Sequence, residues 1–196
     1  MKVGEIIETT RLKLRPWRMS DVPSLTRLYT DDVIMRYMRP GKGLPRTEAE
    51  SRAKANIVNY TQQWQRHGFG VWAVEEPGDK RLIGHCGLNI IEPVNTVEVL
   101  YLLNKTMWGR GYASELAGAA LDFGFRQQGL DRIIGLTHPD NKASQRVLSK
   151  SGLSFQRVSN ELWDTQLAWF EAGREDWLQR SPALPETQAV ISPQSP

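Results

Sequence analysis

Residues 96–114 read TVEVLYLLNKTMWGRGYAS, in which a strand-like run leads through a glycine-rich turn into a helix. The run Thr96–Leu103 is rich in β-branched and aliphatic residues, and the helix that begins at Ser114 extends to about Gln128. A glycine-rich turn at the start of a helix presents free backbone N–H groups at the positive end of the helix dipole. Such a turn binds phosphate groups, so the pattern predicts a phosphate or pyrophosphate site at residues 108–114.

Other phosphate-binding turns fit these residues less well. The P-loop pattern needs a lysine followed by Ser or Thr, which the turn lacks. A dinucleotide fingerprint can be placed on Gly109, Gly111 and Ser114, with Asp131 as its acidic residue. That fingerprint belongs in a parallel β-α-β unit, whereas this turn follows an expected antiparallel hairpin. A glycine turn with no ligand remains the simpler alternative.

The rest of the chain predicts strands and helices packed around this turn. The hydrophobic periodicity and the turn residues divide it into alternating elements. Such an order is typical of a mixed sheet of about seven strands with helices on both faces, an α/β (α+β) architecture. The expected strands are 11–17, 69–75, 81–91, 96–103, 132–137, 155–158 and 166–170, and the expected helices are 20–29, 47–67, 114–128 and 141–150.

Length and composition indicate one globular domain. The chain has 196 residues, of which 40% are hydrophobic and 24% charged, as in ordinary globular proteins. We expect a single domain over residues 1–180. Residues 181–196 are rich in Pro, Ser and Gln and lack the apolar content of a core, so we expect this tail to be disordered.

Several classes of protein are excluded at this stage. No run of eighteen apolar residues exists, so no membrane-spanning helix is expected, and the N-terminus lacks a secretory signal pattern. The net charge of +3 is small and scattered, which argues against direct nucleic-acid binding. The lone Cys86 forbids an intrachain disulfide, and His67 and His138 are too isolated to suggest a metal site. These features favour a cytoplasmic protein without a metal.

The turn resembles the Gln/Arg-x-x-Gly-x-Gly/Ala signature of the GNAT superfamily of N-acetyltransferases, with Gly111 and Ala113 at its last two small positions. Trp108 stands where Gln or Arg is usual, a form similar to the branch of the ribosomal-protein alanine N-acetyltransferases. The resemblance covers roughly residues 8–175. Further matching pieces are Thr10–Pro16, Ile83–Leu88, Asn141–Ser144 and Lys150–Leu153.

The resemblance implies that acetyl-CoA is the cosubstrate and that the strand 97–103 splays from the strand 132–137. The pantetheine arm would pair with the backbone of Tyr101, Leu102 and Leu103. Asn141 would hydrogen-bond the pantetheine or an adjacent carbonyl, although it could equally cap the helix that follows. The pyrophosphate would bind the N–H groups of Trp108, Gly109, Arg110, Gly111, Tyr112, Ala113 and Ser114.

Acetyl transfer to an amine needs a proton acceptor and a proton donor. Deprotonating an ammonium with a pKa near 10.4 at pH 7 costs about 4 to 5 kcal/mol. Glu98 is the only charged residue between Val97 and Leu103, and it matches a glutamate common in the resembled branch. We expect it to accept the proton, with His85 as the alternative. For the departing thiolate, Ser144 is the expected donor because the position of the usual tyrosine holds Leu148.

The sequence therefore predicts an N-acetyltransferase that transfers an acetyl group from acetyl-CoA to a primary amine by direct attack in a ternary complex. A non-catalytic acyl-CoA-binding module of the same fold is the alternative, and a ribosome- or nucleic-acid-associated protein is a second one. The acceptor stays open among a peptide or protein N-terminus, a polyamine, an aminoglycoside and a small amine. The sequence leaves the oligomeric state as monomer or homodimer, and Trp17, Trp64 and Trp163 either line the acceptor site or pack.

Overall fold

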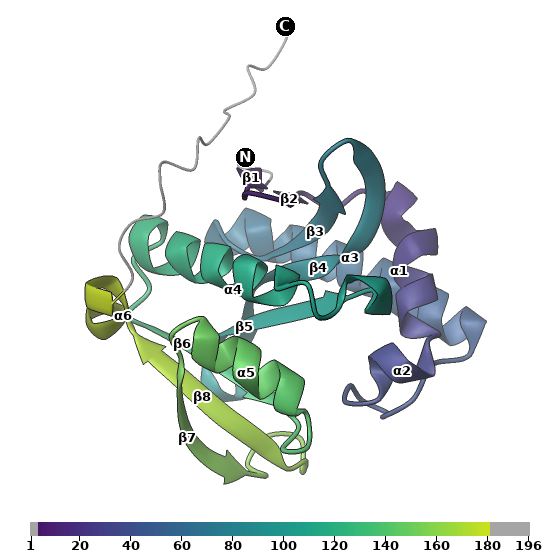
Figure 1. Ribbon diagram of the computed structural model, residues 1–196. Coiled ribbons are helices and arrows are strands. Elements are labelled where there is room, and N and C mark those ends of the chain that lie inside the picture. The colour runs from purple at the N-terminus through teal and green to yellow at the C-terminus, as the bar shows by residue number, and fades with distance from the viewer. Residues whose placement is uncertain (1–3, 181–196) are drawn as a thin grey trace, which may run out of the picture.

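The computed structural model describes residues 4–180, and these residues build one eight-stranded sheet in the order β1-β2-β3-β4-β5-β6-β8-β7 (Figure 1). The eighth strand, beyond the expected seven, is the two-residue β1 at the edge. The tail 181–196 lies outside the described residues. The strands are β1 (Ile7–Glu8), β2 (Lys13–Arg15), β3 (Val71–Glu76), β4 (Asp79–Ile91), β5 (Thr96–Leu103), β6 (Arg132–Thr137), β7 (Ser154–Ser159) and β8 (Leu167–Gly173).

The helices cover both faces of this sheet, as the sequence predicts. In Figure 1, α4 and α5 lie in front of the strands, while α3 passes behind them. Neither α2 nor α6 was expected from the sequence. The helices are α1 (Val22–Tyr29), α2 (Asp32–Met35), α3 (Arg46–His67), α4 (Tyr112–Asp122), α5 (Lys142–Lys150) and α6 (Arg174–Arg180).

Several boundaries differ from the expected ones by a few residues. The first helix was expected from Ser20, but Ser20 lies in a 3-10 turn and α1 begins at Val22, with Pro23 in its first turn. The helix after the glycine turn begins at Tyr112, and its last expected residues, Phe123–Gln127, form a π turn. A side chain on Gly124 in the π turn would collide with Ile133 and Leu88, so the chain lies close against the sheet there.

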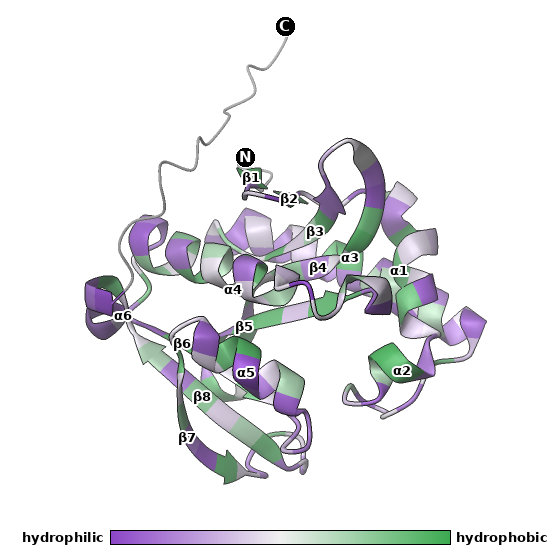
Figure 2. Cartoon of the chain, viewed as in Figure 1, coloured by the Kyte–Doolittle hydropathy of each residue, from purple (hydrophilic) through white to green (hydrophobic). Residues whose placement is uncertain are grey.

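Three hydrophobic clusters of the described residues pack against the sheet, and the two largest form a core on each of its sides. Trp64, Trp72 and Phe123 meet in the core beneath α4, with ring centroids 4.8–5.7 Å apart. Trp64 is therefore a packing residue and does not line the acceptor side. Leu25 and Ile57 belong to the second core, beneath α1 and α3. Figure 2 shows β5, between the two cores, as hydrophobic along most of its length.

The β4–β5 hairpin decides which side chains face which layer. Its register pairs Asn89 with Glu98 and His85 with Leu102. Because side chains alternate along a strand, His85, Asn89 and Glu98 share one face and Cys86 points to the other. Leu102 belongs to the core beneath α1 and α3, so this shared face is the one covered by those helices. The prediction that His85 and Asn89 lie on one face is confirmed.

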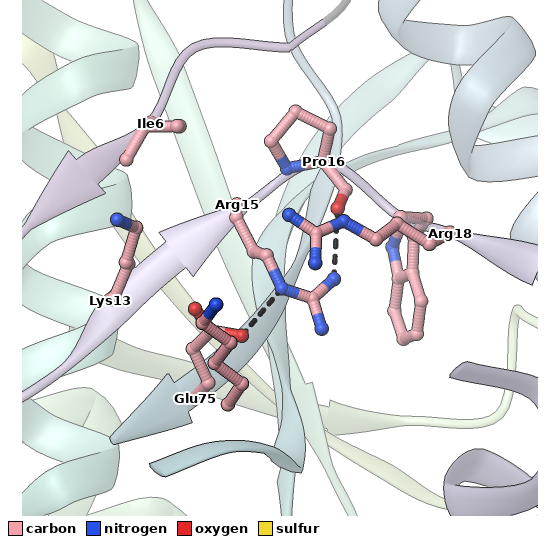
Figure 3. Close-up of a pocket in the computed structure, with 8 residues that line it drawn as sticks. Ile6, Lys13, Arg15, Pro16, Arg18 and Glu75 are labelled. Carbon is pink, nitrogen blue, oxygen red and sulfur yellow. Dashed lines mark hydrogen bonds and ion pairs between the residues drawn. The ribbon is translucent and has the colours of Figure 1, made fainter. Parts of the chain in front are cut away.

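Arg15 on β2 is buried between two carboxylates. Its Nε lies 2.6 Å from Glu75 Oε2 and its Nη2 lies 2.8 Å from Asp21 Oδ1, and all three side chains are less than 10% exposed. The hydrogen bonds to both carboxylates raise the pKa of Arg15 well above its usual value. Figure 3 shows this guanidinium at a cavity of about 320 Å³ next to Lys13, Pro16 and Glu75. Its charge is neutralised, so Arg15 ties β2 to β3.

Replacing Arg15 with methionine should therefore destabilise the fold by about 3 to 5 kcal/mol, because two buried carboxylates lose their shared partner. Urea unfolding measures the loss. The matched control is Lys54→Met, which breaks the 2.7 Å pair between Lys54 and Glu50 on the exposed surface of α3 and should change stability little. A loss below about 1 kcal/mol for Arg15→Met would contradict the bracing role.

Candidate active site

The sheet opens between β5 and β6. These adjacent parallel strands are paired at a single position, Glu98 with Ile134, and beyond it β5 continues to Leu103 without a pairing to β6. The N–H of Asn104 donates to the carbonyl of Ile83, so the alternation of an antiparallel pair turns the main-chain groups of Tyr101 and Leu103 away from β4. Those groups face the opening, as the expected splay requires.

The glycine turn forms the N-terminal end of α4 at the same side of the sheet. Gly109 and Gly111 have φ values of +74° and +78°, a region that residues with a side chain rarely adopt. Within the described residues, no protein acceptor is recorded for the N–H groups of residues 109–114, and the first bond of the helix runs from Glu115 N–H to the Gly111 carbonyl. Free N–H groups at a helix N-terminus suit a diphosphate.

Arginines fasten this turn and add positive charge beside it. Arg11 donates from Nη1 to the Arg110 carbonyl at 2.8 Å and pairs with Glu115 at 2.6 Å. The guanidinium groups of Arg11 and Arg110 both lie over the ring of Tyr112, 4.5 and 4.6 Å from its centroid. Trp108 is half-exposed, and its indole N–H donates to the Leu103 carbonyl at 3.0 Å, which joins the turn to the end of β5.

Across the opening, two hydroxyl groups meet on the side of α5. Asn141 Oδ1 accepts the backbone N–H of Ser144 at 3.1 Å, so Asn141 is the N-cap of α5. The Oγ of Ser144 lies 2.8 Å from the hydroxyl of Tyr101, and burial raises the pKa of that tyrosine. Leu148 is buried and apolar, so it cannot donate a proton. From the sequence, we predicted a role for the backbone of Tyr101 but none for its hydroxyl group.

On the other face of β5, Glu98 lies at the centre of the sheet. Its Oε1 accepts a hydrogen bond from Asn89 Nδ2 at 3.1 Å, and no ion pair of Glu98 is recorded within residues 4–180. The side chain keeps some solvent exposure, yet burial raises its pKa to about 7. A carboxyl group with a pKa near neutrality is suited to accept a proton at physiological pH.

His85 is a weaker candidate for a base. The side chain is 3% exposed and lies beside the stacked rings of Trp17 and Tyr60, with ring centroids 6.1 and 6.0 Å away. Burial and the charge of Arg52 lower its pKa to about 4, so the imidazole is neutral at pH 7. Trp17 stacks on Tyr60 and donates its indole N–H to the Val71 carbonyl, so it packs beside the site.

A polar row lies on α3, the helix that covers this face of the sheet, and it was not predicted from the sequence. The row consists of Arg52, Asn56 and Tyr60, spaced by four residues so that they lie along one side of the helix. Asn56 donates to the hydroxyl of Tyr29 at 2.8 Å, and the guanidinium of Arg52 lies 5.4 Å from the centroid of the same ring. Burial raises the pKa of Tyr60, and the neighbouring charge of Glu98 adds to this shift. The i, i+4, i+8 spacing was the signal available in the sequence.

Other candidates from the sequence lie away from this chemistry. Cys86 is fully buried on the opposite face from Glu98, and burial raises the pKa of its thiol. Trp163 is exposed and lies near Arg39, 6.0 Å from guanidinium to ring centroid. Among residues 4–180, no group of three His, Cys, Asp or Glu side chains is placed to hold a metal ion. No helix in that part of the chain is both long and apolar enough to span a bilayer.

Comparison with known proteins agrees with this geometry. Residues 11–154 match the family model described as an acetyltransferase (GNAT) domain. The chain is 30% identical to YkkB of Bacillus subtilis, over 83% of this chain and 92% of that one, and 30% identical to the N-acetyltransferase YoaA of the same organism, over 78% and 85%. Its fold is similar to that of RimL, a ribosomal alpha-N-protein acetyltransferase in complex with coenzyme A, with a TM-score of 0.70 and 21% identity over 88% of this chain and 99% of that one.

Proposed function

The chain belongs to the acetyltransferase (GNAT) family, and from this membership we propose that it transfers the acetyl group of acetyl-CoA to a primary amine by direct attack in a ternary complex. One observation supports this proposal above the others. Strand β5 presents Glu98 on the face covered by α3 and Tyr101 on the opposite face, beside the opening to β6. An amine and a thioester held on the two sides of β5 would meet where the strands separate.

The residues of the turn and of β5 fit acetyl-CoA. The N–H groups from Gly109 to Ser114, which have no acceptor within residues 4–180, suit its pyrophosphate, and the main-chain groups of Tyr101 and the N–H of Leu103 suit the amides of pantetheine. The main-chain N–H and C=O of Leu102 point to β4 and therefore do not face pantetheine. Leu102 belongs to the proposed set as the residue that connects Tyr101 and Leu103. The proposed cofactor set remains Tyr101, Leu102, Leu103, Trp108, Gly109, Arg110, Gly111, Tyr112, Ala113, Ser114 and Asn141.

Proton transfers at both ends of the reaction then fall to groups of this chain. Acetyl-CoA supplies an acetyl group activated as a thioester. Glu98 accepts a proton from the incoming ammonium, directly or through water, and so frees the nitrogen lone pair that forms the new C–N bond. As the C–S bond breaks, the Tyr101–Ser144 hydroxyl pair donates a proton to the leaving sulfur, and the second proton that the nitrogen loses on becoming an amide restores that pair through water. Ser144 is the proposed donor, and Tyr101 is placed to replenish or replace it.

The alternative function is a non-catalytic module that binds acyl-CoA without turnover. Its support is Leu148, which fills the position of the usual tyrosine with a buried apolar side chain. Release of free CoA from acetyl-CoA in the presence of a panel of primary amines separates the two functions. Amine-dependent release supports the transferase, whereas tight CoA binding with no release above the amine-free rate supports the module.

Changing the hydroxyl pair should slow the transfer step. We expect Ser144→Ala and Tyr101→Phe each to lower kcat about 10- to 100-fold with little effect on CoA affinity, because general-acid catalysis contributes about 10²- to 10⁴-fold and one hydroxyl can partly replace the other. The double variant should lose more than either single variant. Thr106→Val, which removes a hydroxyl from the neighbouring 3-10 turn, is the control. Wild-type kcat in the double variant would exclude the pair as proton donor.

A further inference from the structure

On the face of the sheet under α3, three central side chains are only partly buried. Asn89 lies on β4, and Glu98 and Leu100 lie on β5, the two central strands of the sheet. Each of the three side chains nevertheless retains partial solvent exposure. Side chains at such positions are normally covered by the helices of the adjacent layer. We use the name acceptor groove for the part-exposed surface formed by these residues and by Tyr60 of α3.

Two ring contacts hold the loop that follows α2. The ring of Tyr37 lies 5.5 Å from that of His138, and Arg39 lies over Trp163. Both contacts join the loop after α2 to segments that follow β6 and β7, which are distant in the sequence.

Arg52 brings an uncompensated positive charge to this groove. It is half-buried, and within residues 4–180 its recorded polar contacts are one hydrogen bond to the Arg39 carbonyl, at 2.8 Å, and the ring of Tyr29. No carboxylate lies within ion-pair distance of it in that range. A guanidinium has five N–H donors, so Arg52 keeps enough donors to bind both oxygens of a carboxylate. By contrast, the buried Arg15 has two carboxylate partners.

Tyr60 links Arg52 to the face of the sheet that carries Glu98. Arg52 and Tyr60 are eight residues apart on α3, about 12 Å of helix rise. The ring of Tyr60 lies 6.0 Å from that of His85, which shares its face of the sheet with Glu98. The groove therefore presents a proton acceptor at one end and a bidentate anion-binding group at the other.

From these positions we propose that the acceptor is a small amino acid or short peptide whose free carboxylate binds Arg52 while its amine approaches Glu98. This inference rests on the proposed acetyl transfer and adds the class of acceptor. Planar guanidinium groups bind carboxylates through two parallel hydrogen bonds, which fixes the orientation of the molecule as well as its affinity. A polyamine or an amine without an anion would leave Arg52 unpaired.

Matched pairs of acceptors test the proposal. Amino acids, ω-amino acids of increasing length and dipeptides are each compared with their C-terminal carboxamides, by CoA release and by calorimetric binding to the CoA complex. For the wild-type chain we expect kcat/KM at least about 10-fold higher for the best acid than for its carboxamide. Arg52→Gln should lower kcat/KM and affinity for the acid about 100-fold while leaving those for the carboxamide within about 3-fold.

Two further variants separate recognition from folding. Arg52→Lys keeps the charge but loses the planar fork, so it should retain part of the preference. Arg66→Gln removes an exposed charge from the same helix, about 21 Å further along, and should leave the preference unchanged. Thermal unfolding of all variants shows whether any loss comes from the fold.

The outcomes distinguish this inference from the function on which it rests. Equal kcat/KM for acids and carboxamides, an equal loss of both in Arg52→Gln, or transfer to polyamines or long peptides alone would overturn the role of Arg52 and leave acetyl transfer intact. Absence of CoA release with every amine would contradict the proposed transfer. In that case, calorimetric binding to the CoA complex still tests the role of Arg52. Equal affinities for acids and their carboxamides would overturn that role.

Discussion

Replacing Gly111 with valine should weaken the binding of CoA by at least about 100-fold, the equivalent of about 3 kcal/mol. Gly111 has a φ of +78° at the N-cap of α4, where a side chain costs about 1 to 2 kcal/mol, and more for a β-branched residue. A Cβ at this position meets only the guanidinium of Arg11, at 3.5 Å, so the protein itself has room for it. The larger cost arises because the valine would turn the N–H groups and fill the space of the phosphates.

Isothermal calorimetry with CoA measures this loss. The control is Gly118→Ala on the same helix, where no atom lies within 4 Å of the added Cβ and the helical conformation suits alanine. Gly118→Ala should keep the affinity for CoA and raise stability slightly. A folded Gly111→Val chain that binds CoA as tightly as the wild type would remove the basis for placing the pyrophosphate at residues 108–114.

The second large effect concerns Glu98. Glu98→Gln preserves the shape and the contact with Asn89 but cannot accept a proton, so kcat should fall about 10²- to 10⁴-fold with CoA affinity unchanged. In the wild type, Glu98 must be ionised before it can accept a proton. Because its pKa is about 7, kcat/KM should fall as the pH drops below about 7, and this acidic limb should be absent in the variant.

Stability measured against pH gives an independent test of Glu98. Its folded-state pKa is raised above the value of about 4.5 in an unfolded chain, so its contribution to stability is complete below pH 4.5 and is lost as the pH rises through 7. The glutamine variant has no such loss. Relative to the wild type, Glu98→Gln should therefore gain up to about 3 kcal/mol between pH 4.5 and pH 8.

Two results would contradict the assignment of Glu98. Wild-type turnover with an unchanged acidic limb would exclude it as the base, and His85→Asn would then be the next variant. Lower melting with normal turnover at low temperature would show that Glu98 only supports the sheet. The neutral, buried His85 should give no acidic limb near pH 7, since its pKa is about 4.

Much of the fold follows from local sequence. The strands 96–103 and 132–137 have the predicted bounds, because compact β-branched and aliphatic runs between turn residues define a strand by themselves. The glycine turn could also be predicted from local sequence, because the positive φ values of Gly109 and Gly111 are a property of single residues. For Asn141, the sequence allows either a ligand contact or a helix cap. In the structure, its Oδ1 accepts a hydrogen bond from the N–H of Ser144.

Contacts between distant segments belong to the tertiary structure alone. The face on which Glu98 lies depended on the register of the β4–β5 hairpin, because a shift of one residue would move it to the other side of the sheet. The pair of Tyr101 and Ser144 joins residues 43 apart in the sequence, and Arg15 meets Glu75 across 60 residues. The sequence determines which chemical groups the chain carries. Which of those groups meet depends on how helices and strands pack, and packing is a property of the whole chain.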